Sequence, residues 1–432
     1  MSRRPELKKE ENVKNLTRRD FLRFGAAGMA GVAGAVNFPM LGWGLPLASP
    51  GSNFFTIAVI SDTQNYVDVT HQQPFNVNFF LSQTKYLADN INKLNLAFVT
   101  HVGDVVQHGD GTNGSSGNSS YGAGGEWVNA KSAIDILADA GLPFGMSIGN
   151  HDYDNYSYKT GNLPLESNVW WKKYFGSGST YFAGKSWYGG ASDNLAVNPG
   201  LSSYQTFSAS GRKFLHISLE LEPGDRAIAW AQGVIDSHPG CPTIITTHSY
   251  LSPPPWGDDG LPLVEPAVRN AAIYLAGSPG GWNGADGIWN KLVAPNDQVF
   301  LVLCGHAWTP TNANGVSKGE NIRIDKNKAG HPVYQVLTDY QGNTSLGSGG
   351  GDGWYRFMQF DMDKNIIHFS TYNPYVSKYA GQNGTSTFDQ PPEFSDFSLD
   401  MPAQVIKAHA GAGIVSLQAF ISKARSISER AI

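Results

Sequence analysis

Short apolar runs alternate with amphipathic stretches along this chain, and this alternation constrains the fold more than any other feature of the sequence. Buried strands are expected at 55–60, 96–100, 143–148, 243–247 and 299–303. Segments with helical periodicity lie between them. One example places four apolar residues on one face of the expected helix: Phe80, Tyr86, Leu87 and Ile91. Strands that alternate with helices indicate an α/β core, and no break between 54 and 372 is typical of an interdomain linker.

Polar residues follow each of these five strands, and they are the candidate site residues. They are Asp62, Asp104, Asn150, His248 and His306. In an α/β sheet, ligands and catalytic groups gather at the carboxyl ends of the strands, so these side chains are expected to meet. Carboxylate, amide oxygen and imidazole together suit Mn, Fe or Zn, and the lack of thiolate disfavours a purely structural zinc site.

The order of these motifs resembles the calcineurin-like metallophosphoesterases. The family pattern is Asp-x-His, Gly-Asp, Gly-Asn-His-Asp/Glu, His, then Gly-His-x-His, and the resemblance runs from residue 54 to about 372. It implies an α/β fold, a four-layer αββα sandwich in which two mixed sheets are flanked by helices. It also implies a dinuclear metal site at one edge, within a domain expected at 52–400.

The resemblance assigns a role to each matching residue. Asp62 would bind the first of two divalent metal ions and Asp104 would bridge both. Asn150, His248 and His306 would complete the second site. In the family a metal-bound hydroxide attacks phosphorus.

The family motif also implies a pair of catalytic residues in this chain. His151, held by Asp152, would contact the phosphate or protonate the leaving oxygen.

The sequence departs from the family pattern at two positions that serve the first metal. Gln64 stands where Asp-x-His has its histidine, and Trp308 stands where Gly-His-x-His has its last histidine. Three interpretations stay open, of which we favour the first. Gln64 supplies an amide oxygen to a weaker site that favours Mn, Mg or Ca; another residue, Asp339 or Gln341, replaces a ligand; or the first site is empty.

The N-terminal segment, residues 1–48, is interpreted as an export signal and linker. Residues 17–23 read TRRDFLR and precede an uncharged run from Phe24 to Val36, a pattern that resembles the bacterial twin-arginine signal. This predicts export through the twin-arginine machinery to the periplasm or the medium. No stretch after residue 50 is long and apolar enough to predict a membrane span in the mature chain.

Charge argues against one further class of protein, and the cysteine positions argue against a disulfide. Residues 1–50 hold eight basic and four acidic side chains, whereas the remainder holds 23 basic and 32 acidic ones. That balance argues against a nucleic-acid binder, which needs a basic surface.

Cys241 and Cys304 lie at different distances from His248 and His306, so they are expected to be displaced by about five residues, roughly 16 Å, along the sheet. Two buried free thiols are therefore predicted.

Four lesser features have structural and functional interpretations. The aromatic insertion at 153–190 is either a hydrophobic cluster or a wall that stacks a ring of the substrate. The tail, 401–432, is expected to pack on the body as a helix. Ser147 matches a Gly-x-Ser-x-Gly elbow but lies inside a strand, so it is not expected to be a nucleophile. His101 is expected to support the site and His108 to be a loop residue or substrate contact.

The predicted function is an exported, metal-dependent phosphoesterase that hydrolyses a phosphomonoester or phosphodiester. The alternative is a catalytically degenerate protein on the same fold, which binds a phosphorylated or glycan ligand.

Overall fold

The computed structural model describes residues 53–68, 77–111, 124–154, 168–196, 199–253, 267–271, 281–309, 319–343, 350–379 and 395–406. The chain divides into two units, and every described residue lies in the unit formed by Trp43–Pro254 and Pro266–Ile432. Three sequence predictions lie wholly or partly outside the described residues: the export signal at 1–48, the tail beyond 406, and residues 155–167 of the aromatic insertion.

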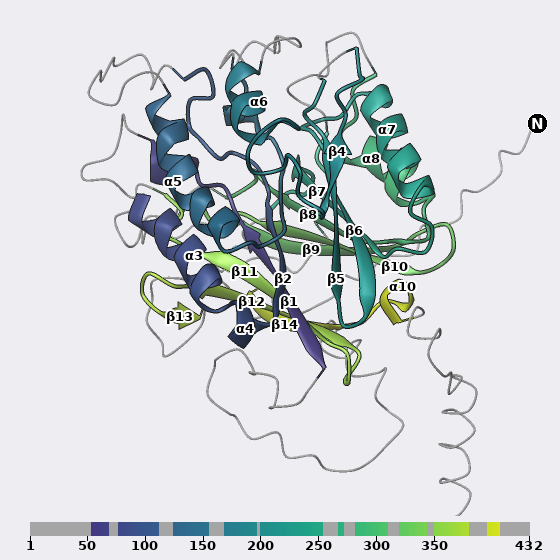
Figure 1. Ribbon diagram of the computed structural model, residues 1–432. Helices are drawn as coiled ribbons and strands as arrows, with labels where there is room; N and C mark the ends of the chain where they lie inside the picture. Colours follow the sequence, from purple (N-terminus) through teal and green to yellow (C-terminus); the bar gives the residue numbers. More distant parts are fainter. Residues whose placement is uncertain are drawn as a thin grey trace, which may run out of the picture. The chain divides into compact units, whose positions relative to one another are not determined.

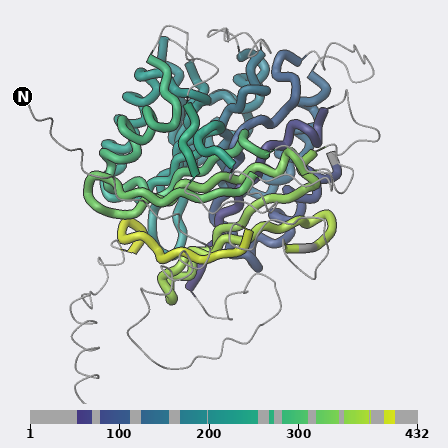
Figure 2. The backbone as a smooth tube through the Cα atoms, turned by 180° about the vertical axis from the view of Figure 1, so that it is seen from behind, coloured from purple at the N-terminus to yellow at the C-terminus, as the bar shows by residue number. Residues whose placement is uncertain are grey.

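Two mixed β-sheets form the centre of the fold (Figure 1). The first has the order β13-β12-β11-β1-β2-β3, with β14 also paired to β12. Its strands are β1 (Phe54–Ile60), β2 (Leu96–His101), β3 (Phe144–Met146), β11 (Tyr355–Asp361), β12 (Ile366–Asn373), β13 (Lys378–Tyr379) and β14 (Asp396–Asp400). Figure 2 shows the yellow β14 from behind, alongside the green C-terminal strands.

The second sheet has the order β4-β5-β6-β7-β8-β10-β9. Its strands are β4 (Tyr188–Ala191), β5 (Ser203–Ala209), β6 (Arg212–Ser218), β7 (Thr243–Ser249), β8 (Val299–Gly305), β9 (Glu320–Lys326) and β10 (Pro332–Thr338). Each sheet contains a run of adjacent parallel strands: β1 to β3 in the first, and β6, β7, β8 and β10 in the second. Their carboxyl ends therefore point the same way within each sheet, which sets the position of the site.

The alternation of side chains along β1 shows how the two sheets pack. Phe55, Ile57 and Val59 belong to the core between the sheets, where they meet residues of β6, β8 and β11. Ala58 and Ile60 point the other way and join the core between the first sheet and its helices. Because successive side chains of a strand face opposite sides, a strand that is apolar throughout must be covered on both faces.

Helices cover the outer face of each sheet (Figure 1). The helices are α2 (Gln64–Val67), α3 (Val77–Asp89), α4 (Ile91–Leu94), α5 (Gly125–Asp139), α6 (Val169–Phe175), α7 (Asp225–Asp236), α8 (Ala285–Ile288) and α10 (Ala403–Ile406), with the π-helical turn η4 at Trp289–Val293. Helices α3 and α5 pack on the first sheet, and α7, α8 and η4 pack on the second. The predicted α/β sandwich of two mixed sheets with flanking helices is confirmed.

The described part of the aromatic insertion is a hydrophobic cluster. Trp171, Tyr174 and Phe175 of α6 are buried, and the Tyr174 ring stacks on Trp127 of α5 with 5.6 Å between centroids. These rings attach α6 to the helical layer of the first sheet. Of the two interpretations of this insertion, its described residues favour the structural one.

The two cysteines are free, as predicted. Cys304 is buried in β8, but Cys241 is only half-buried because it lies in the turn before β7, so the expectation of burial was wrong for Cys241. Among the described residues, no helix has both the length and the apolar character that crossing a bilayer would require.

Candidate metal centre

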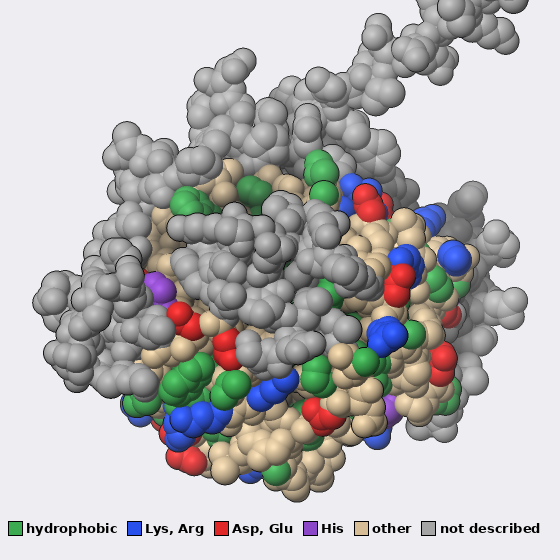
Figure 3. All heavy atoms as spheres, turned by 90° about the horizontal axis from the view of Figure 1, so that it is seen from above, with side chains coloured by type: hydrophobic (Ala, Val, Ile, Leu, Met, Phe, Trp, Pro, Cys, Tyr) green, Lys and Arg blue, Asp and Glu red, His purple; other side chains and the backbone are tan. Residues whose placement is uncertain are grey.

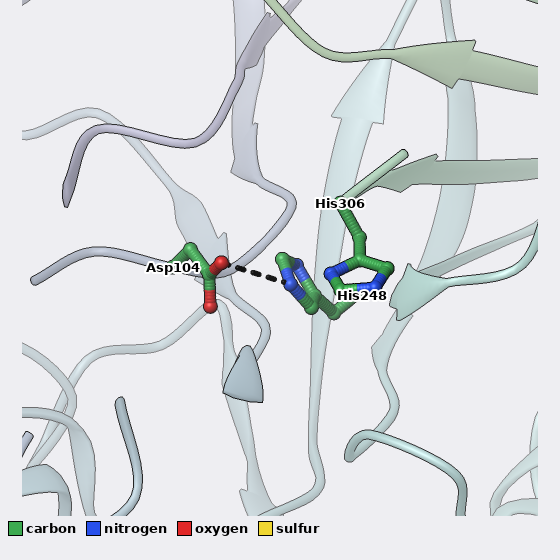
Figure 4. Close-up of side chains that lie close together, drawn as sticks. All are labelled: Asp104, His248 and His306. Carbon is green, nitrogen blue, oxygen red and sulfur yellow. Dashed lines mark ion pairs between the residues drawn. The ribbon is translucent and has the colours of Figure 1, made fainter. Parts of the chain in front are cut away.

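The polar residues predicted at the strand ends meet at one edge of the two sheets. Asp62 follows β1, Asp104 follows β2, Asn150 begins the short helix η2 (Asn150–Asp152) after β3, His248 lies in β7, and His306 follows β8. Figure 4 shows Asp104, His248 and His306 turned toward one another from the two sheets. One ligand atom from each of these three lies within 4.8 Å of the others.

His248 is the centre of this group. Its Nε2 lies 3.0 Å from Asn150 Oδ1 and 3.2 Å from Asp104 Oδ2. Its Nδ1 lies 3.0 Å from the carbonyl oxygen of Val102 and 3.8 Å from Asp62 Oδ1. A carbonyl can only accept a hydrogen bond, so Nδ1 carries a proton and Nε2 is the nitrogen turned toward the cluster.

Two glycines allow the strand ends to approach each other. Gly103 has φ +108°, and a Cβ there would lie 2.7 Å from His248 Nδ1. A Cβ on Gly149 would lie 2.1 Å from Asp104 Oδ1. Any larger side chain at either position would collide with a candidate ligand, which explains the glycine in Gly-Asp and in Gly-Asn-His-Asp.

Burial and charge shift the pKa values of the cluster in opposite directions. Burial and the charge of Asp339 raise the pKa of Asp62 well above its usual value. Burial acts the same way on Asp104, but the charges of His248 and His151 outweigh it and lower the pKa of that carboxyl. Burial disfavours protonation of His248, yet Asp104 and Asp62 raise its pKa to about 9. A single imidazole with a raised pKa thus faces several buried carboxyl groups.

His306 behaves differently from His248. Burial and the neighbouring charge of His248 lower the pKa of His306 to about 3. The ring is therefore neutral at physiological pH, the state in which imidazole binds metal ions. Its backbone N–H donates to Asp62 Oδ1 at 3.0 Å, which joins the ends of β8 and β1.

Gln64 begins α2 directly beside this cluster. Its Nε2 donates to Asp104 Oδ2 at 3.2 Å and to Gln341 Oε1 at 2.5 Å. Its Oε1 is buried and has no hydrogen-bond partner. A buried carbonyl oxygen without a partner is costly, and a cation is the kind of group that would satisfy it. The donor set and this orphaned oxygen both fit divalent metal ions.

The structure gives Asp152 a different role from the predicted one. Its Oδ1 accepts the backbone N–H groups of Val105 and Val106 at 2.8 and 3.0 Å, and its Oδ2 accepts that of Gly149 at 2.9 Å. The expectation that Asp152 holds the His151 ring is therefore wrong. The carboxylate instead ties the turn after β2 to the turn after β3, a contact that sequence reasoning missed because backbone amides leave no sequence signal.

His151 is held by a carbonyl group. Its backbone N–H donates to Asp104 Oδ1 at 2.9 Å, and its Nδ1 lies 3.1 Å from the Gln107 carbonyl oxygen. A carbonyl oxygen can only accept, so Nδ1 carries a proton in this contact. The residue is half-buried, so a solute can reach it.

Two further histidines near the site have supporting roles. His101 is buried, its Nε2 lies 3.0 Å from Thr63 Oγ1, and burial lowers its pKa to about 3. This confirms its expected role beside the site. His108 Nδ1 lies 2.8 Å from Glu126 Oε1, while Glu126 Oε2 accepts the backbone N–H groups of Gln107 and His108. Glu126, which sequence reasoning missed, thereby fixes the segment that carries the Gln107 carbonyl.

Ser147 confirms the prediction that the Gly-x-Ser-x-Gly match is not a nucleophile elbow. The residue is fully buried directly after β3, and its Oγ donates to the Thr246 carbonyl oxygen at 2.9 Å. A serine whose hydroxyl is committed to the backbone of the other sheet does not face a substrate.

The geometry agrees with the family of the chain. The calcineurin-like phosphoesterase family model matches residues 55–310, more than half of the sequence, and the chain belongs to this family. It is 30% identical over 361 residues to the uncharacterized protein YvnB of Bacillus subtilis (strain 168). That match covers 83% of this chain and 23% of YvnB, so the chain spans about a quarter of this relative's length.

Two solved structures are also similar. A dimetal phosphatase from Danio rerio is 10% identical, with a TM-score of 0.40 over 80% of this chain and 98% of that one. GAP50, described as the anchor in the inner membrane complex of Plasmodium, is 12% identical, with a TM-score of 0.35 over 78% and 92% of the two chains.

Proposed function

We propose that this chain is a metal-dependent phosphoesterase that hydrolyses a phosphomonoester or a phosphodiester. The observation that carries the proposal is the convergence of Asp104, His248 and His306, with Asn150 at hydrogen-bond distance from His248. Carboxylate, amide and imidazole donors on the ends of different strands form a divalent-metal site rather than a hydrophobic core contact.

Two groups of residues would hold the two metal ions of such a reaction. Asp104, Asn150, His248 and His306 would hold one ion, and Asp62 with Gln64 would hold another next to the shared Asp104. Bound divalent cations supply Lewis-acid chemistry: they neutralise phosphoryl charge and lower the pKa of water.

His151 would act on the substrate directly. Its Nδ1 lies 3.1 Å from the Gln107 carbonyl oxygen, so Nε2 is the nitrogen that would hold a phosphoryl oxygen or donate a proton to the leaving oxygen when the ring is protonated at both nitrogens. Asp152 would contribute only by fixing the two turns that carry Asp104 and His151.

The charge of the chain supports cations at the site. After residue 50 the acidic side chains outnumber the basic ones by 32 to 23. Figure 3 shows the described acidic and basic side chains interspersed on the face seen from above. A phosphate ester approaching such a surface would be attracted by bound metal ions, since no excess of Lys and Arg supplies the attraction.

Substitution of the shared carboxylate tests this function. In Asp104→Ala we expect both ions to be lost and hydrolysis of an aryl phosphate to fall by more than about 10³-fold. Metal analysis and turnover with Mn, Fe, Zn, Mg and Ca measure the two effects. Full turnover in Asp104→Ala would refute the mechanism. A wild-type protein that binds neither ion and hydrolyses no ester would instead support the degenerate binding protein, which the departures at Gln64 and Trp308 motivate.

We also propose that the chain is exported, with residues 1–48 as the signal and linker. The basis is the TRRDFLR sequence at 17–23 and the uncharged run that follows it. Replacing both Arg18 and Arg19 by Lys should retain the full-length chain in the cytoplasm of a bacterial host. Unchanged export of this variant would contradict the twin-arginine route.

A further inference from the structure

We propose that Asp339 takes the place of the histidines missing at positions 64 and 308, so that the first metal position is built from oxygen atoms alone. This inference rests on the proposed function, because it concerns a ligand of the same site. Its consequence is that the first position takes a hard cation, Mn²⁺, Mg²⁺ or Ca²⁺, while the second keeps the nitrogens of His248 and His306.

The β-sheet register brings Asp339 to the site. Strand β10 runs parallel to β8, and Leu337 pairs with Cys304. Asp339 and His306 each lie two residues beyond this pair, so they leave the sheet at the same level. The backbone N–H of Tyr340 donates to Ser61 Oγ at 3.4 Å, which joins this segment to the residue before Asp62.

Trp308 is more exposed than the candidate metal ligands. Its side chain is 40% exposed, whereas Asp62, Asp104 and Asp339 are at most 2% exposed. The position that holds the family's last histidine is therefore turned to solvent in this chain, and Asp339 supplies a buried side chain from the adjacent strand.

Hydrogen bonds connect Asp339 to Gln64 through Gln341. Both Asp339 oxygens accept from Gln341, Oδ1 from its backbone N–H and Oδ2 from its Nε2, each at 2.8 Å. Gln341 Oε1 in turn accepts from Gln64 Nε2 at 2.5 Å. Gln341 thus acts as a positioning residue that orients two candidate ligands at once.

The charges in this group are unbalanced without a cation. Asp62, Asp104 and Asp339 are all buried, and the hydrogen bond from Tyr340 to Ser61 brings Asp339 close to Asp62. Among the described residues, no Lys or Arg forms an ion pair with any of the three. Buried charges are stable only when they are paired or bound to metal. The orphaned Oε1 of Gln64 lies in the same group.

The alternative is that Asp339 only caps the turn formed by residues 339–341. The two roles predict opposite behaviour when metal is absent. A purely structural carboxylate stabilises the turn with or without metal. A metal ligand, by contrast, adds like-charge repulsion to Asp62 and Asp104 when the cation is removed.

The test is Asp339→Asn in the full-length protein, with Asp361→Asn as the matched control. Asp361 pairs with Phe54, at the opposite end of β1, and its carboxylate contacts Lys364. We expect Asp339→Asn to weaken the binding of one Mn²⁺ by about 10- to 100-fold and to leave the second ion in place. Isothermal titration with Mn²⁺ and metal analysis measure this, and Asp361→Asn should match the wild type.

Thermal unfolding in chelator separates the two roles of Asp339. We expect metal-free Asp339→Asn to unfold at the same temperature as the metal-free wild type or at a higher one, and to gain less from added Mn²⁺. Two ions bound with wild-type affinity, or a variant that is less stable than the wild type in chelator, would overturn the inference and leave the proposed function intact. A wild-type protein that binds no ion would overturn both.

Discussion

The two sides of the candidate metal centre differ in chemistry although they share Asp104. One side has two imidazoles, from β7 and β8, with the amide of Asn150 beside them. The other side has the carboxylate of Asp62, the amide of Gln64 and, across Gln341, the carboxylate of Asp339. Both departures from the family pattern fall on this second group. The difference indicates that one half of a metal site can change its ligands while the other half keeps them, even though positions 306 and 308 follow the same strand.

The largest effect that tests this asymmetry is expected from His306→Ala. The imidazole side should lose its ion and turnover should fall by about 10²–10³-fold, because a neutral nitrogen ligand is removed while the oxygen side stays intact. Metal analysis should find one ion in the variant. That ion should dissociate no faster than the ion on the oxygen side of the wild-type protein. His238→Ala is a matched control, since His238 contacts Val234 at the end of α7. Loss of both ions in His306→Ala would show that the two sides do not act separately.

A smaller effect is expected from pH on the metal-free protein. Burial raises the pKa of Asp339 to about 7, so stability falls as pH rises from the unfolded value near 3.8 to about 7. The pKa of His248 is raised to about 9, so its contribution is present below 6.5 and is lost as pH rises to about 9. The buried His101, His216 and His306 act in the opposite direction, but only below pH 6.5.

Between pH 6.5 and 9 the metal-free protein should therefore lose stability, and the raised pKa of Asp152 adds to this loss. Urea unfolding at both pH values in chelator, and again with Mn²⁺, measures the change. With metal bound the loss should disappear, because the ion binds the deprotonated ligands. The same pH dependence with and without metal would contradict the assignment of His248 and Asp339 to the site.

The smallest effect is expected from Trp308→Ala. Because this side chain is 40% exposed, the free energy of unfolding should change by less than about 0.5 kcal/mol and the metal content should not change. Metal analysis and urea unfolding of the variant against the wild type test this. Loss of an ion from Trp308→Ala would indicate that the residue at position 308 contributes to the metal site, and it would weaken the argument for Asp339.

Much of the site was predictable because strand ends carry a local signal. Apolar runs that end in Asp62, Asp104 and His306 identify both the strands and the edge at which they meet. Asp339 was only a weak candidate, because its proximity to Asp62 depends on β10 pairing parallel with β8, a long-range register that no local pattern encodes.

The partners of Asp152 were predicted wrongly for a related reason. Sequence adjacency suggested His151, whereas the carboxylate reaches across to backbone amides of Val105 and Val106. Backbone donors have no residue identity, so only the fold reveals them. The burial of Trp171 shows the same limit, since an aromatic-rich segment is equally typical of a core and of a binding wall.

The position of β1 in the first sheet has a consequence for how this chain folds. Strand β1 pairs with β2 through residues 56–60 and with residues 356–361 through residues 54–59. A nascent chain therefore leaves one edge of β1 open until residues 356–361 have been synthesised. Pairings this distant in sequence are slow to form, and an open apolar strand is prone to aggregate in the meantime. A fragment that ends at 310, where the family match ends, would keep that edge permanently exposed.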